Sequence, residues 1–302
     1  MKRNWIQCAL GLALLLAVPA GWAAGTGTAE TEHALPLHAV ELGRVGGFPI
    51  TNSMVATWLV AAGLILAVRW ATRRMRAVPQ GAQNFWEWLV GGLYDFLTDI
   101  LGPGLIKKTF WFFATVFLFI LSCNWFALIP GAGTIGWGPA SGHAFILTRV
   151  TQPLFRGANA DLNLTLAMAM VFFGCWVVWA LQANGVKGFL LHIFGPKGET
   201  TGVLKLFMVL VFMAVGVLEV ISILFRPVSL SLRLFGNIYA GENLLEAMAG
   251  IVPALGWLIP LPFYFLELLV GVVQALVFML LTAVFTLLIC QHDEGAEEAH
   301  SS

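Results

Sequence analysis

The chain has 302 residues, of which 59% are hydrophobic and 11% charged, and its mean hydropathy is +0.85. Soluble domains carry about 25% charged residues, so this composition excludes an ordinary soluble protein. The 16 Lys and Arg residues balance the 16 Asp and Glu residues, and a net charge of zero gives no reason to expect nucleic acid as a partner. The composition predicts a membrane protein.

Residues 1–24 have the pattern of a secretory signal peptide. Lys2 and Arg3 precede an apolar run at 8–18, and small residues follow it. This order of charge, short apolar run and small residues predicts that the segment is cleaved off to give the mature protein. An uncleaved anchor helix is the alternative. Residues 25–50 are polar, and we expect them to form an external N-terminal segment.

Five further apolar stretches, within a membrane domain at 51–290, are long enough to cross a bilayer, which takes about 20 residues for about 30 Å of hydrocarbon. Arginines at 69–76 and lysines at 187–205 make the loops that contain them cytoplasmic by the positive-inside rule. The mature N-terminus is then periplasmic, and the acidic tail at 291–302 is cytoplasmic. The stretches lie near 51–70, 109–129, 161–183, 205–249 and 252–290.

Residues 82–101 have a different pattern. Polar residues recur there at steps of three and four among aromatic and leucine residues, as they do in an amphipathic helix. The segment is too charged to span, so we predict that it lies along the cytoplasmic face of the membrane. A connector without a function of its own is the alternative.

The fourth apolar stretch is too long for one upright span. The residues from 205 to 249 make about 67 Å of helix, which is more than twice the hydrocarbon thickness. Pro227 within the stretch favours a kink. The sequence therefore predicts an all-α polytopic membrane protein of about five transmembrane helices, the last two long and strongly tilted, with one interfacial amphipathic helix.

The last two stretches carry charged residues inside the membrane. Such a residue at the bilayer centre costs at least about 2.5–3.5 kcal/mol, so several of them mark an ion path, a cofactor site or an interface. The sequence offers no mid-membrane histidine pair for haem, no nucleophile triad and no phosphate loop, so we expect no cofactor and interpret the set as a path for charge. The charged residues are Glu219, Arg226, Arg233, Glu242, Glu246 and Glu267, and they are accompanied by the uncharged polar residues Asn237 and Gln274.

Helical geometry separates these residues. At about 100° per residue, four of them share one face, and Glu242 lies about 180° from Arg233. The four are Glu219, Arg226, Arg233 and Asn237. Because a guanidinium stays protonated, Arg233 is a fixed cation that repels protons and favours the ionised form of a carboxylate beside it. An internal set of salt bridges that holds the helices together is the alternative. The expected outer entry is lined by Glu242, Glu267, Asn237 and Gln274, and the expected inner exit by Glu219.

Three runs carry a resemblance to a known family. One, between Arg226 and Glu242, contains the string Ser-Leu-x-Leu-Arg-Leu-x-x-Asn centred on Arg233. A second begins at Gln274, and a third opens the third span at Asp161. Together they resemble subunit a of the F-type ATP synthase, over roughly residues 35–295.

The resemblance implies the stator half of a rotary proton motor in the bacterial inner membrane. The tilted helices would pack against a ring of c subunits, with peripheral-stalk b subunits as further partners. Protons would pass Glu242 and Glu267 from outside, ride on ring carboxylates for nearly a full turn and leave near Glu219, while Arg233 separates the two half-channels. Nucleotide chemistry would take place on other subunits, so this chain is expected to be non-catalytic and to bind no nucleotide.

Two other functions stay open from the residues alone. A secondary transporter would bind a solute and act without partners, and a structural assembly subunit would tolerate a neutral replacement of Arg233. The choice between H⁺ and Na⁺ as coupling ion is also open, because the ion site would lie mainly on the partner ring.

Overall fold

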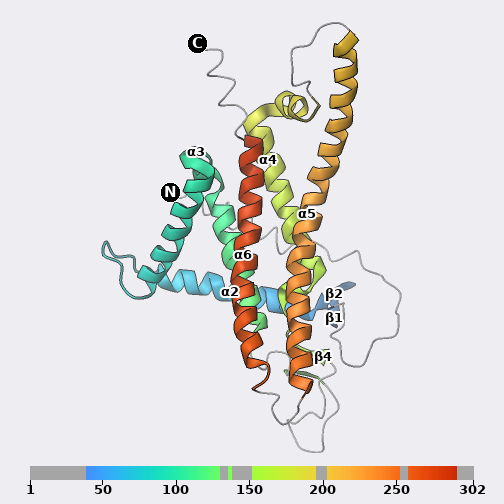
Figure 1. Cartoon of the computed structure of the whole chain (residues 1–302). Helices are drawn as coiled ribbons and strands as arrows, with labels where there is room; N and C mark the ends of the chain where they lie inside the picture. The colour runs from blue at the N-terminus through green and yellow to red at the C-terminus, as the bar shows by residue number, and fades with distance from the viewer. Residues whose placement is uncertain (1–38, 130–134, 138–151, 195–202, 252–257, 291–302) are drawn as a thin grey trace, which may run out of the picture.

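The computed structural model describes residues 39–129, 135–137, 152–194, 203–251 and 258–290. Within them, five helices are long and apolar enough to cross a membrane, which confirms the predicted all-α polytopic fold (Figure 1). The expected signal peptide at 1–24, the tail at 291–302 and the start of the last predicted span at 252–257 lie outside the described residues. The helices are α2 (Asn52–Ala71), α3 (Ala82–Ala127), α4 (Leu162–Phe194), α5 (Val203–Ile251) and α6 (Leu261–Cys290).

Two short antiparallel strand pairs, which the sequence did not lead us to expect, accompany the helices. β1 (Glu41–Val45) and β2 (Phe48–Thr51) form a hairpin whose turn is Gly46-Gly47. Both glycines have positive φ, as the two-residue hairpin turns that match strand twist require. β3 (Gly136–Trp137) pairs with β4 (Gln152–Pro153), and a short 3-10 helix, η2 (Ala158–Ala160), leads into α4.

Two of the helices are bent at glycines. In α3 the backbone breaks at Gly102, which has φ 74° and precedes Pro103, so the amphipathic segment at 82–101 and the span that follows it belong to one bent element. In α4 the break is at Gly185, with φ 65°. Positive φ is strained for residues with a side chain, so glycine at these two positions permits the bends. The membrane-surface location of 82–101 stays a prediction.

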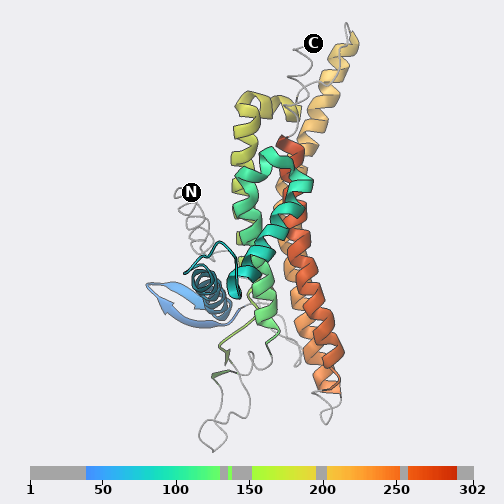
Figure 2. The same ribbon diagram turned by 90° about the vertical axis from the view of Figure 1, so that its left-hand side faces the viewer.

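The helices α5 and α6 lie side by side, and the axis of α2 runs roughly at right angles to theirs. In Figure 1 α2 lies sideways to the upright α5 and α6, and in Figure 2 it is seen end-on, on the other side of α3 and α4. The 49 residues of α5 continue through Pro227 and make about 73 Å of helix, whereas the 20 residues of α2 make about 30 Å, the thickness of the hydrocarbon layer. All three helices therefore cannot stand upright together. An upright α2 leaves α5 and α6 strongly tilted, as we predict.

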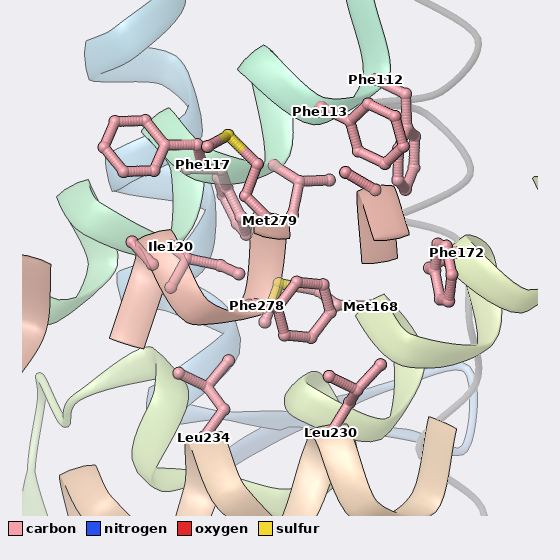
Figure 3. Close-up of a cluster of buried hydrophobic side chains, with 14 of the residues drawn as sticks. Phe112, Phe113, Phe117, Ile120, Met168, Phe172, Leu230, Leu234, Phe278 and Met279 are labelled. Atoms are coloured by element: carbon pink, nitrogen blue, oxygen red, sulfur yellow. The ribbon is translucent and has the colours of Figure 1, made fainter. Parts of the chain in front are cut away.

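The core lies where α3 packs on α6 and α4 packs on α5. Burial of large apolar side chains at this junction keeps the helices in contact. From α5 the buried side chains include Leu230, Leu234 and Ile238, which recur at steps of four and so occupy one face of the helix. Figure 3 shows the cluster, whose labelled members are Phe112, Phe113, Phe117, Ile120, Met168, Phe172, Leu230, Leu234, Phe278 and Met279.

Candidate functional site

Arg233 and Asn237 lie on the exposed side of α5. Both are solvent-exposed, whereas Leu230 and Leu234, on the neighbouring face of the same turns, are buried in the core. Among the described residues, the ion pairs within 4.0 Å do not include Arg233. The fold thus presents a guanidinium and an amide, one turn apart, away from its own helices.

Glu219 and Arg226 form an ion pair with each other. The distance from Arg226 Nη2 to Glu219 Oε1 is 3.0 Å. The Arg226 guanidinium also lies 4.7 Å from the ring centre of Phe285 and 5.9 Å from that of Trp176, within the range of cation–π attraction. The alternative of an internal salt bridge therefore applies to this pair, which ties α5 to α4 and α6.

Glu267 lies on α6 with its carboxyl group against the backbone of α5. Its residue is 6% exposed. At Gly241 of α5 an added Cβ would overlap both the Oε atoms and Cδ of Glu267, so only glycine admits the carboxyl group there. Oε1 of Glu267 is buried, and the described residues give it no hydrogen-bond partner. A buried carboxyl oxygen of this kind is one that an incoming proton or water can use.

Glu242 follows Gly241 directly, so the fold brings together the two acids that we predicted from different helices. The charges of Glu267 and Glu246 both act on Glu242. Gln274 is half-buried on α6, about 10 Å along the helix from Glu267. Glu219 belongs to a separate place, because about 35 Å of α5 lies between it and Glu242.

A segment that we did not predict as part of the site covers Glu242. The backbone N–H of Gly157 donates a hydrogen bond to the Glu242 carboxylate, and Arg156 acts on it electrostatically. Arg156 is only 8% exposed. The sequence did not lead us to assign a role to the loop at 131–160, so Arg156 was missed. The signal was the small uncharged run Gly-Ala-Asn-Ala after Arg156, which can be buried.

Buried polar groups hold this segment in place. Asn159 Nδ2 donates to Asn124 Oδ1 at 2.6 Å, and Asn124 Nδ2 donates to the Gly271 carbonyl at 3.0 Å. Asp161 accepts a hydrogen bond from Ser53 Oγ at 2.5 Å. These bonds link η2 to α3, α6 and α2, and hydrogen-bonded polar networks of this kind fix one arrangement of the helices. In the described part of the chain, no group of three or more His, Cys, Asp or Glu residues could hold a metal ion.

Comparison with known proteins identifies a single family. Residues 54–286 match the model of the ATP synthase A chain. Among curated relatives, "ATP synthase subunit a 3" of Pelobacter propionicus is 34% identical over 88% of this chain and 93% of its own length. "ATP synthase subunit a" of Desulfotalea psychrophila is 35% identical over 77% and 81%. "ATP synthase subunit a, sodium ion specific" of Propionigenium modestum is 31% identical over 85% and 80%.

Proposed function

This chain belongs to the ATP synthase A chain family, and we propose that it is the stator subunit that carries protons in the membrane sector of an F-type ATP synthase. In this proposal it provides two offset half-channels that load and unload the carboxylates of a rotating c-ring. Proton flow through them is thereby coupled to ATP synthesis. The nucleotide chemistry takes place on other subunits, so this chain is not itself catalytic.

The observation that carries the proposal is the position of Arg233. A cation inside an apolar helix is costly to insert, so it needs a partner or water. Arg233 is exposed on α5, outside the face that enters the core, and none of the described residues forms an ion pair with it. An anionic partner outside this chain, such as a carboxylate on each c subunit, supplies the missing charge.

The outer half-channel is proposed to run past Glu242 and Glu267, with Asn237 and Gln274 as further polar lining. Its support is the Glu267 carboxyl group, buried against α5 beside Gly241, and the half-buried Glu242 that follows Gly241 and is held by the Gly157 N–H. A proton that arrives there moves to a ring carboxylate, which in neutral form can face lipid. Arg233 keeps its proton and blocks a direct leak between the half-channels, because a guanidinium does not release a proton in proteins.

The inner half-channel is proposed to pass Glu219. Its carboxylate pairs with Arg226 but stays 45% exposed as a side chain, so one side of it is accessible to water or to a passing proton. Because Arg226 holds the carboxylate from the other side, Glu219 has a fixed position beside the exit path.

The proposal also includes the membrane in which the chain lies, the sides on which its ends lie and its partners. The membrane helices and the bacterial relatives indicate a multi-pass protein of the inner membrane. The charge pattern of the loops supports a periplasmic N-terminus and a cytoplasmic C-terminus. The partners are the c-ring, the peripheral-stalk b subunits and the lipid bilayer, without nucleic acid or nucleotide.

The test is Arg233→Ala in the assembled complex, assayed in inverted vesicles for ATP-driven proton pumping and passive proton leak. We expect normal assembly, loss of coupled pumping and a raised leak. Leu232→Ala, which changes an exposed neighbour on α5, is the matched control and should pump normally. Normal pumping by Arg233→Ala would contradict the proposal.

The coupling ion needs a second assay, because the Propionigenium modestum relative is described as sodium ion specific. Pumping by the unaltered complex is measured with and without Na⁺. We expect proton pumping that does not require Na⁺. A strict requirement for Na⁺ would overturn the choice of ion while leaving the stator role intact.

A further inference from the structure

The segment from Arg156 to Asp161 enters the helix bundle instead of running over its surface. All of its residues are buried, and η2 within it contacts α5 as well as α2, α3 and α4. Two buried hydrogen bonds from the Asn159 amide, to Asn124 Oδ1 and to the Ile120 carbonyl, anchor the segment. A segment anchored in this way can hold a side chain that contacts Arg156 or Gly157 in a fixed position.

What the segment touches is the carboxylate of Glu242. The N–H of Gly157 donates a hydrogen bond to this carboxylate. An added Cβ at residue 157 would overlap Glu242 Oε1 and would lie 3.0 Å from Ala127 Cβ. The carboxylate therefore occupies the space that any other side chain at position 157 would need. This is a close fit between a backbone and one functional group, not a general packing contact.

The charge of Arg156 completes this arrangement. A buried guanidinium costs several kcal/mol unless an anion is near, and Arg156, at 8% exposure, acts electrostatically on Glu242. Glu267 and Glu246 add negative charge at the same place. One cation beside several acids reduces the repulsion that would otherwise drive the carboxylates apart.

We infer that Arg156 is a positioning residue of the outer half-channel, which holds the Glu242 carboxylate against the Gly157 N–H and beside Glu267. This inference rests on the proposed function. Arg156 does not carry the proton itself, because its guanidinium does not release one. It fixes the distance over which a proton passes between the two acids, and a misplacement of about 1 Å can lower such a rate about a hundredfold.

The experiment compares Arg156→Gln with Arg156→Lys in the complete complex. ATP synthesis driven by an imposed proton gradient is measured after assembly has been verified. We expect Arg156→Gln to lower synthesis by about tenfold to a hundredfold and Arg156→Lys, which keeps the charge, to retain a clearly larger share. Equal activity of Arg156→Gln and the parent, or no advantage of lysine over glutamine, would overturn the inference.

A double variant separates positioning from mere packing. If Arg156 acts through Glu242, Arg156→Gln combined with Glu242→Gln should be no worse than Glu242→Gln alone, whereas independent losses would multiply. Should Arg156→Gln fail to assemble, the added Glu242→Gln is expected to restore assembly by removing the uncompensated acid. Failure of the double variant to assemble would overturn the inference.

The same series distinguishes this inference from the proposed function. If Glu242→Gln lowers synthesis and Arg156→Gln does not, the inference fails and the half-channel stands. If Glu242→Gln and Arg233→Ala both leave synthesis unchanged, the proposed function fails.

Discussion

Gly241 is the residue that allows the carboxyl group of Glu267 to lie beside α5. Because an added Cβ would overlap that carboxyl group, we expect Gly241→Ala to push α5 and α6 apart at this point. Overpacking of this kind costs about 1–3 kcal/mol, and the displaced acid should lower ATP-driven proton pumping. The readouts are the melting temperature of the purified complex and pumping in inverted vesicles.

Gly236 supplies the matched control on the same helix. Apart from its own turn of helix, an alanine there would meet no atom of the described residues within 4 Å, so Gly236→Ala should leave the melting temperature almost unchanged. If Gly241→Ala and Gly236→Ala lower the melting temperature equally, the close approach of the Glu267 carboxyl group is not the reason that position 241 requires glycine.

Asn124 connects three elements through one buried amide. It accepts from Asn159 and donates to the Gly271 carbonyl, so Asn124→Ala removes one buried hydrogen bond from each of them, while Asn159 keeps its bond to the Ile120 carbonyl. Each intramolecular hydrogen bond contributes about 0.5–1.5 kcal/mol, so the two losses should appear as a lower melting temperature of the complex. Ser122→Ala, at a half-buried position of the same helix, is the comparison and should have a much smaller effect.

Single residues differ in how well the sequence revealed them. The sequence singles out Arg233 because a charge inside an apolar helix has few explanations, and its azimuth relative to Glu242 follows from helical geometry. Its role in proton transport stays a prediction. Arg156 was not, because it lies in a loop, where charge is ordinary. Its burial depends on contacts between η2 and four helices, which no local pattern encodes. The pairing of Glu219 with Arg226 was open for a similar reason, since side chains seven residues apart can point to each other or to solvent.

At the scale of an element, the bend in α3 depends on Gly102. Its φ of 74° and ψ of 164° lie in a region that residues with a side chain enter only at a cost of about 1–3 kcal/mol. We expect Gly102→Ala to lower the melting temperature of the complex accordingly. Gly104→Ala, two residues on and without positive φ, removes a helical glycine and should be neutral or stabilising by up to about 1 kcal/mol. Equal effects of the two variants would show that the bend does not need glycine.

The elements themselves were largely predictable, and their ends and joints were not. Long apolar runs identify the helices because a bilayer demands about 20 apolar residues per crossing. The break of α3 at Gly102 agrees with the predicted end of the amphipathic segment at 101, since a Gly-Pro pair usually ends a helix, but the direction in which the next helix leaves could not be anticipated. The β1–β2 hairpin was missed as well, although Gly46-Gly47 is a typical two-residue turn. Hydropathy identifies long apolar helices, and it does not identify a short strand pair in a polar segment.

For the whole molecule, the angle between α2 and the pair α5 and α6 decides the orientation in the membrane. The sequence indicated tilt only through length, because a helix longer than the bilayer is thick can tilt, kink or protrude. The arrangement of helices adds that α2, whose length suits an upright span, has its axis roughly at right angles to the other two. A measurement of depth in the bilayer tests the tilt directly.

Nitroxide labels at two exposed positions of α5, Leu218→Cys and Leu244→Cys, test the tilt in the reconstituted complex, with the native cysteines replaced by alanine. About 39 Å of helix separates these positions, more than the hydrocarbon thickness of about 30 Å. An upright α5 therefore puts at least one label in water, whereas a strongly tilted α5 keeps both in hydrocarbon. We expect both labels to collide with oxygen and not with a water-soluble nickel chelate. Ala62→Cys in the middle of α2 calibrates the hydrocarbon signal, and a water signal from either α5 label would contradict the tilt.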